Sequence, residues 1–195
     1  MDSQLLQPDT ALSEHASLIE QRLEDCAKRL QPEDMRDLLG PASRELVSVT
    51  VGALRGDSAS LWLVDADHSR LIVSHVEPMD PDMMNREQPV DEGLVGLVLG
   101  SGQAVCENKV YENTQHSKRT DAALGTITCA MIAVPFYTGG TLRGVLSCVK
   151  LKDSEDDPDP DDFTAADLNR AKRLSSGLER LLNYRMLVAI LGLEL

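Results

Sequence analysis

Cysteine and histidine are the residue types in this sequence that could hold a metal or carry redox chemistry. The four cysteines form no Cys-x-x-Cys pair, and no histidine stands at the spacing that a zinc site requires. We therefore expect free thiols, no metal and no intramolecular disulfide, with Cys106 the most accessible thiol. The residues considered are Cys26, Cys106, Cys129, Cys148, His15, His68, His75 and His116.

The run of acidic residues at 153–162 has carboxylates at alternating positions, a pattern that resembles a calcium-binding loop. Such a loop needs glycine at its sixth position and glutamate at its twelfth. Here these positions hold Pro158 and Thr164. We therefore expect a solvated connector and no calcium site.

Glycine and serine near position 100 could indicate a phosphate-binding loop or a nucleophile. The stretch 96–102 is rich in glycine, but no Lys-Ser or Lys-Thr pair follows it and no Gly-x-Gly-x-x-Gly is present. Ser101 lacks the Gly-x-Ser-x-Gly frame of a nucleophile elbow. The sequence therefore predicts no catalytic residues, and we expect that the protein is not an enzyme.

The overall charge argues against nucleic acid and membranes as partners. The chain of 195 residues has 32 acidic and 19 basic residues, a formal net charge of −13. Phosphate-backbone binding normally needs a basic surface. The most apolar stretch, 186–193, is much shorter than the roughly 20 residues that span a bilayer. The first residues do not resemble a secretory signal, so we expect a cytoplasmic protein.

The elements at the two ends of the chain read as amphipathic helices. Apolar residues recur at steps of four and three from Leu12 to Leu30, with Leu5 one heptad earlier, which predicts one helix over 11–30. Pro32 begins a second helix that is broken at Gly40-Pro41, and another begins at 163–164 and passes 182. The apolar faces of these helices either pack only on their own domain or also pair with a second chain. We favour the second alternative, a homodimer.

The middle of the chain alternates short strands with loops. The segments 59–65 and 70–76 read as a hairpin, as do 128–138 and 141–151 around Gly139-Gly140. A short helix over 93–100 and a strand over 103–107 lie between loops at 77–89 and 108–120. A turn at Gly139-Gly140 places Cys148 opposite Met131, and Cys129 opposite Lys150.

This order of elements predicts an α+β fold. An antiparallel sheet carries the N- and C-terminal helices on one face and a ligand pocket under loops on the other. We divide the chain into an N-terminal amphipathic dimerisation helix (1–32), a domain (33–185) and an apolar C-terminal helix extension (186–195).

Six short strings, in this order, resemble those of the GAF domain family over about residues 40–185. They are ASLWLVD at 59–65, EGLVG at 92–96, GQAV at 102–105, AVPF at 133–136, RGVL at 143–146 and FTAAD at 163–167. The resemblance implies the GAF fold, small-molecule sensing or regulatory dimerisation, and an output through a downstream signalling protein.

The resemblance leaves the ligand unnamed. Lys150, Phe163 and Asp167 match three positions of the signature of cyclic-nucleotide-binding members, and Lys150 could pair with Asp167. Val149 and Leu168 replace the Asn and Glu of that signature, so a cyclic nucleotide is open but disfavoured. Bilin-binding members use a cysteine, often beside a histidine, and sulfoxide-reducing members use cysteines in the loop after 108. This chain has neither pattern.

By analogy with ligand-binding members, nine residues would form the pocket. Lys118 and Arg119 would supply positive charge, which favours a small, partly planar anion. The alternative is that the apolar members are core and that 116–119 is a solvated loop. The function is then either a sensory module with a bound ligand or a ligand-free dimerisation or protein-interaction module. The nine residues are Ser60, Trp62, Leu94, Val95, His116, Lys118, Arg119, Asp121 and Thr128.

Overall fold

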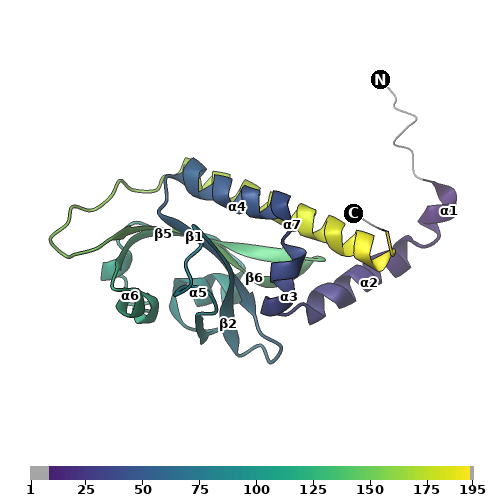
Figure 1. Ribbon diagram of the computed structural model, residues 1–195, viewed down its shortest axis with the longest axis horizontal. Coiled ribbons are helices and arrows are strands. Elements are labelled where there is room, and N and C mark those ends of the chain that lie inside the picture. The colour runs from purple at the N-terminus through teal and green to yellow at the C-terminus, as the bar shows by residue number, and fades with distance from the viewer. Residues whose placement is uncertain (1–8, 194–195) are drawn as a thin grey trace, which may run out of the picture.

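The computed structural model describes residues 9–193 and is built around one antiparallel sheet of six strands (Figure 1). The strand order is β3-β2-β1-β6-β5-β4, so the last long hairpin, β5–β6, lies beside the first one, β1–β2. Alternate residues of a strand point to opposite faces of the sheet, and both faces here are covered. The strands are β1 (Ser58–Val64), β2 (Arg70–Glu77), β3 (Glu87–Pro89), β4 (Val105–Glu107), β5 (Ile127–Thr138) and β6 (Thr141–Lys152).

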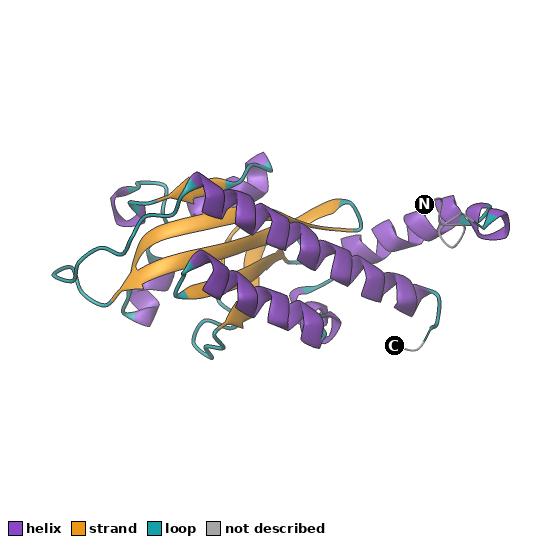
Figure 2. Ribbon diagram, turned by 90° about the horizontal axis from the view of Figure 1, so that it is seen from above, coloured by secondary structure: helices purple, strands orange, loops and turns teal. Residues whose placement is uncertain are grey.

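The terminal helices cover one face of the sheet. Helices α4 and α7 run side by side across it, and α2 projects past its end towards α1 (Figures 1 and 2). Leu61, Ile132 and Leu146 point from the strands into the core beneath these helices, where they meet Val47 and Leu178. The helices are α1 (Thr10–Ser13), α2 (Ala16–Arg29), α3 (Pro32–Leu38), α4 (Pro41–Leu54) and α7 (Ala165–Ile190).

The opposite face carries shorter elements. These are α5 (Gly93–Ser101), the 3-10 turn η2 (Val110–Glu112) and α6 (Arg119–Leu124). A second core lies on this face, with Trp62 and Val145 from the strands packed against Leu94 and Val98 of α5. The α+β architecture expected from the sequence is confirmed, with the terminal helices on one face and loops and small helices on the other.

Helix α7 begins where the sequence places it, but its expected ion pair does not form. The Thr164 hydroxyl accepts a hydrogen bond from the Asp167 amide, and the Asp167 carboxylate accepts one from the Thr164 amide, a capping box. The Lys150 ammonium donates to the Asp161 carbonyl oxygen at 2.6 Å and lies 4.6 Å from the ring centre of Phe163. The expectation of a Lys150–Asp167 pair is wrong because Asp167 is engaged in the cap.

The expected register of the β5–β6 hairpin is wrong by one residue. Cys148 lies opposite Ile132, and Lys150 opposite Ala130. The register shifts after the Gly139-Gly140 turn because Arg143 is an extra residue on β6, a β-bulge. The buried Arg143 side chain donates to the Leu30 carbonyl oxygen at the end of α2, at 2.7 Å.

Short elements also differ from the expectation. The predicted helix over 11–30 is divided by a turn at Glu14 and His15 into α1 and α2, and Leu5 lies outside the described residues. The expected loops at 77–89 and 108–120 contain the three-residue strand β3 and the start of α6. In the part of the chain that is described, no helix has the length and apolar character needed to cross a membrane.

Candidate ligand-binding site

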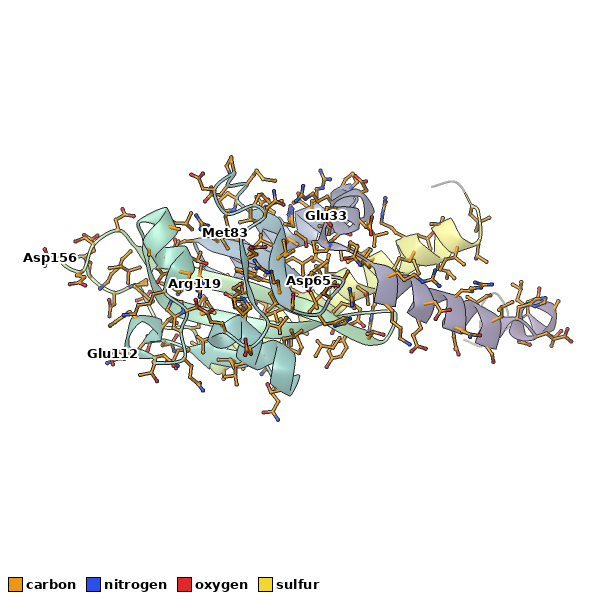
Figure 3. The ribbon with its side chains drawn as sticks, turned by 90° about the horizontal axis from the view of Figure 1, so that it is seen from below. Glu33, Asp65, Met83, Glu112, Arg119 and Asp156 are labelled. Carbon is orange, nitrogen blue, oxygen red and sulfur yellow. The ribbon has the colours of Figure 1, made fainter. Side chains whose placement is uncertain are left out.

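A cavity of about 270 Å³ lies on the loop-covered face of the sheet. Strands β1, β5 and β6 form its floor, the loop between β2 and β3 and the start of α5 form its sides, and α6 with the residues before it forms a lid. Figure 3 views this face of the molecule, with Met83 of the side loop and Arg119 of α6 labelled. The floor residues are Ser58, Ser60, Trp62, Thr128, Met131, Ser147, Val149 and Leu151.

The floor contains a closed group of hydrogen bonds. Ser60 and Ser147 are paired across β1 and β6, and their hydroxyl oxygens are 3.0 Å apart. The Trp62 indole N–H donates to both oxygens, at 3.0 Å and 3.2 Å. All three side chains are buried, and buried polar groups are costly unless they are paired. The polar side chains of the floor therefore satisfy one another.

A carboxylate of the lid is hydrogen-bonded to the floor. Asp121 of α6 accepts hydrogen bonds from the amide of Thr128 at 3.0 Å and from its hydroxyl at 2.7 Å. The same carboxylate lies 3.1 Å from Nε2 of His116, whose side chain is only 6% exposed. Burial by itself raises the pKa of Asp121, but hydrogen bonds from His116 and Thr128 outweigh it and hold this pKa below its usual value. Asp121 is therefore ionised at neutral pH.

The side of the cavity at α5 is fixed by Glu92, the residue before that helix. Its carboxylate accepts from the Ser117 hydroxyl at 2.6 Å and from Nε of Arg119 at 2.9 Å. The Ser117 hydrogen bond is the main reason why the pKa of Glu92 lies below its usual value. The Gln88 side-chain amide donates to the Glu92 carbonyl oxygen at 2.5 Å. Gly93 follows with a positive φ of 71°, which a glycine adopts without strain.

Seven of the nine residues expected at the pocket line this cavity, and two do not. The side chain of Arg119 is 70% exposed and turned towards Glu92, and Lys118 lines a different hollow. The expected positive charge is therefore absent from the lining, and the argument for an anion loses its basis. The seven are Ser60, Trp62, Leu94, Val95, His116, Asp121 and Thr128.

Several lining residues carry no signal in the sequence. Ser147 could be found only from the pairing of β1 with β6, two strands that are separated by most of the domain. Asp80, Asp82 and Met83 belong to the loop expected at 77–89, and no sequence pattern indicates that this loop lies beside the floor. Gln88 lies in β3, which was not expected.

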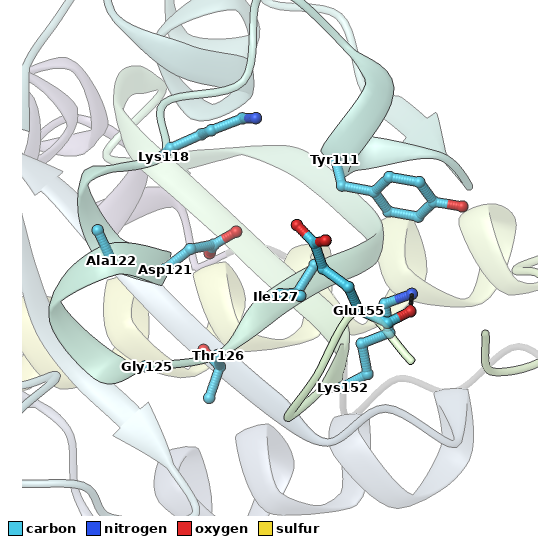
Figure 4. Close-up of a pocket in the computed structure, with 9 residues that line it drawn as sticks. All are labelled: Tyr111, Lys118, Asp121, Ala122, Gly125, Thr126, Ile127, Lys152 and Glu155. Carbon is cyan, nitrogen blue, oxygen red and sulfur yellow. Dashed lines mark hydrogen bonds between the residues drawn. The ribbon is translucent and has the colours of Figure 1, made fainter. Parts of the chain in front are cut away.

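A second hollow of about 550 Å³ lies on the outer side of α6, where Figure 4 shows Lys118 extending towards Tyr111. The Tyr111 hydroxyl donates to Asp159 at 2.6 Å, which raises the pKa of Tyr111 to about 12. Lys152 contacts the same carboxylate at 2.8 Å. Lys118 and Glu155 are exposed here, whereas the side chains of the smaller cavity are mostly buried or half-buried. We therefore take the smaller cavity as the candidate site.

Comparisons with known proteins agree with this architecture. A family model described as a GAF domain matches residues 33–183, and no curated protein matches the sequence. The GAF domain of a phosphoenolpyruvate-protein phosphotransferase from Coxiella burnetii is 16% identical, with a TM-score of 0.62, and the match covers 94% of this chain and 99% of that one.

Two further solved structures show the same fold. The GAF domain of the phosphotransferase from Acinetobacter is 18% identical over 95% of this chain and 99% of that one, with a TM-score of 0.58. The GAF domain of a two-component sensor histidine kinase from Bacillus halodurans is 18% identical over 76% and 97%, with a TM-score of 0.52. Since the family model spans most of the sequence, this chain belongs to the GAF domain family, whose members are commonly sensory or regulatory parts of signalling proteins.

Proposed function

We propose that this chain is a non-catalytic sensory domain that binds a small cytoplasmic ligand and signals through its terminal helices as a homodimer. The observation that carries the proposal is the cavity of about 270 Å³ between an ordered floor and a lid held by Asp121. Concave sites with apolar walls and a few polar groups are typical of small-molecule binding. The output would pass to a downstream signalling protein, with neither nucleic acid nor a membrane as partner.

The side chains at the cavity favour binding over catalysis. A serine nucleophile needs an adjacent base, but the hydroxyls of Ser60 and Ser147 are bonded to each other and to Trp62. None of the four cysteines, all within the described residues, lines the cavity. Cys148 points into the core under the terminal helices, where burial raises its pKa to about 12.

Direct bonds connect the floor strands with the terminal helices. Strand β5 carries Thr128 in the floor, and farther along its Pro135 carbonyl oxygen accepts from the Ser175 hydroxyl of α7 at 3.2 Å. The amide of Gly139, in the β5–β6 turn, donates to Asn183 of α7 at 2.8 Å. These bonds support a route by which a change at the floor would reach α7.

The single tryptophan of the chain provides a direct test of ligand binding. Trp62 lies in the floor, so a ligand that enters the cavity should change its fluorescence and raise the melting temperature by mass action. Native mass spectrometry of protein purified from its own host would identify a bound molecule. Ligand-dependent fluorescence and melting shifts support the proposal.

Two matched variants separate cavity binding from binding elsewhere. Leu124→Phe places a larger side chain into the cavity from α6, whereas Ala122→Phe places one on the outer side of the same helix. We expect Leu124→Phe to weaken the ligand response at unchanged circular dichroism and Ala122→Phe to leave it intact. Equal responses in both variants would place the binding site outside the cavity.

The dimer is tested on the exposed apolar side chains of the N-terminal helices. Leu12 of α1 is 65% exposed and Leu18 of α2 is 53% exposed, while Val49 of α4 is 48% exposed. We expect the double change Leu12→Glu, Leu18→Glu to weaken the dimer in light scattering and Val49→Glu to leave it unchanged. A monomeric native chain would contradict this part of the proposal.

These exposed leucines also favour the second candidate function, a ligand-free dimerisation or protein-interaction module. In that case the chain would still dimerise through its terminal helices. A dimer that carries no ligand from its host and shows no response to a broad panel of metabolites would establish this alternative.

A further inference from the structure

The carboxylates that line the cavity outnumber its basic groups. Asp80, Asp82 and Asp121 belong to the lining, and His116 is its one basic residue among those described. The His116 ring is already within hydrogen-bond distance of Asp121. An anionic ligand in this cavity would face carboxylates of like charge, which is unfavourable.

The cations closest to the lid in the sequence are directed elsewhere. Arg119 pairs with Glu92 at 2.9 Å, and Lys118 extends into the second hollow on the outer side of α6 (Figure 4). The charge of Arg119 is therefore neutralised at the rim by a carboxylate that holds Ser117 as well. No lysine or arginine among the residues described lines the cavity.

Apolar and aromatic side chains make up much of the remaining wall. Trp62 and Met131 lie in the floor, and Met83, Leu94 and Val95 lie in the sides. Tryptophan offers a large apolar ring surface, and methionine fits irregular apolar shapes. The carboxylates are not gathered as metal ligands, because the described residues contain no group of three or more His, Cys, Asp or Glu side chains that could hold an ion.

We infer that the ligand is a small organic cation, an amine or quaternary ammonium compound, whose charge faces Asp80 and Asp82 and whose apolar part contacts Trp62 and Met131. The inference rests on the proposed function, since it names the chemical class that the sensory cavity accepts. The net charge of −13 acts in the same direction at long range, because it attracts cations to the protein.

The test compares probes of one shape and three charges. Choline, 3,3-dimethylbutan-1-ol and 3,3-dimethylbutanoate form a cationic, neutral and anionic set, and butylamine, butanol and butanoate form a second set. Each is titrated into the full chain while Trp62 fluorescence is recorded. We expect saturable binding of at least one cation, about tenfold or more tighter than its neutral counterpart, and no binding of the anions.

A charge variant with a matched control links the preference to the lining. Asp80 is half-buried and Asp82 exposed, so Asp80→Asn, Asp82→Asn should keep the fold while it reduces cation affinity about tenfold. Asp67→Asn changes an exposed carboxylate in the β1–β2 turn, outside the lining, and should leave affinity unchanged.

The outcomes distinguish this inference from the function on which it rests. Neutral or anionic probes that bind as tightly as their cationic counterparts would overturn the cation preference while the binding function stands. A double variant that binds cations as tightly as Asp67→Asn would also overturn it. If no probe binds, the cation inference is overturned. Native mass spectrometry of protein from its own host and the panel of metabolites then decide whether the cavity binds a ligand at all.

Discussion

Replacement of Asp121 by asparagine should loosen the lid of the cavity. Both carboxylate oxygens are in use: Oδ2 contacts the Thr128 amide and His116, and Oδ1 accepts from the Thr128 hydroxyl. Asparagine has the same shape but only one oxygen. Its NH₂ group therefore faces either the Thr128 amide, which is a donor, or the Thr128 hydroxyl, which then has to reverse its role.

The expected loss follows from these contacts. Hydrogen bonds to charged groups contribute about 1.5–3 kcal/mol each, and an unpaired buried donor costs about 1–3 kcal/mol. Because asparagine can keep some of the hydrogen bonds that Asp121 makes, we expect the free energy of unfolding to fall by about 2 kcal/mol. In a domain of this size that corresponds to a decrease in Tm of roughly 4–8 °C.

Urea unfolding at pH 7 measures this difference, and Asp67→Asn serves as the control. Asp67 is exposed in the β1–β2 turn, and surface substitutions of this kind usually change stability by less than about 0.5 kcal/mol. If Asp121→Asn is as stable as Asp67→Asn, the carboxylate does not hold the lid and the reasoning is wrong.

The pH dependence gives a second check on the same carboxylate. The pKa of Asp121 is lower in the folded protein than in the unfolded chain. Its ionised form therefore stabilises the fold above the unfolded pKa of about 3.9. The contribution is lost as the pH falls from there through the lower, folded pKa. The difference between the native chain and Asp121→Asn should thus be full at pH 7 and shrink below about pH 4, whereas an unchanged difference would exclude the charge as its source.

Three further predictions concern the frame around the cavity. Gly144→Ala should destabilise the sheet by about 3 kcal/mol or more, measured by urea unfolding, because a Cβ there would overlap the Trp62 carbonyl oxygen of the neighbouring strand. Thr164→Ala should cost about 1 kcal/mol in the same assay, since it removes the cap of α7. Cys148 should be alkylated far more slowly at pH 7 than the half-exposed Cys26, because burial raises the pKa of Cys148 to about 12. Peptide mass spectrometry would measure the two alkylation rates, and denaturant should abolish the difference between them.

The long elements could be predicted from the sequence because their hydrophobic patterns repeat several times. The β5–β6 hairpin has an unambiguous glycine turn, and α7 has both a capping box and many turns of apolar spacing. The three-residue strand β3 and the six-residue helix α6 are too short for a periodic pattern to form. The bulge at Arg143 accompanies a tertiary contact with Leu30, and no local sequence pattern indicates either feature.

At the candidate site, too, local sequence patterns place some residues, whereas tertiary contacts place the others. Ser60 and Trp62 could be assigned to one face because alternate strand residues share it. Arg119 could not be oriented, because the sequence gives no sign of α6 or of the Glu92 carboxylate beside it. Ser147 enters the floor through the pairing of β1 with β6, a contact between residues far apart in the chain.

The helices on the two faces of the sheet differ in how firmly they are packed against it. The helices α4 and α7 bury apolar side chains such as Val47 and Leu178 in the larger core. The lid helix α6 has no fully buried residue, and of its side chains only the half-buried Leu124 packs against the second core. Hydrogen bonds from Thr128 to Asp121 add to this contact. Elements with little buried apolar surface open at low free-energy cost. We therefore expect α6 to open for ligand entry while α7 stays packed, so that the route from ligand to output runs through β5 and not through the lid.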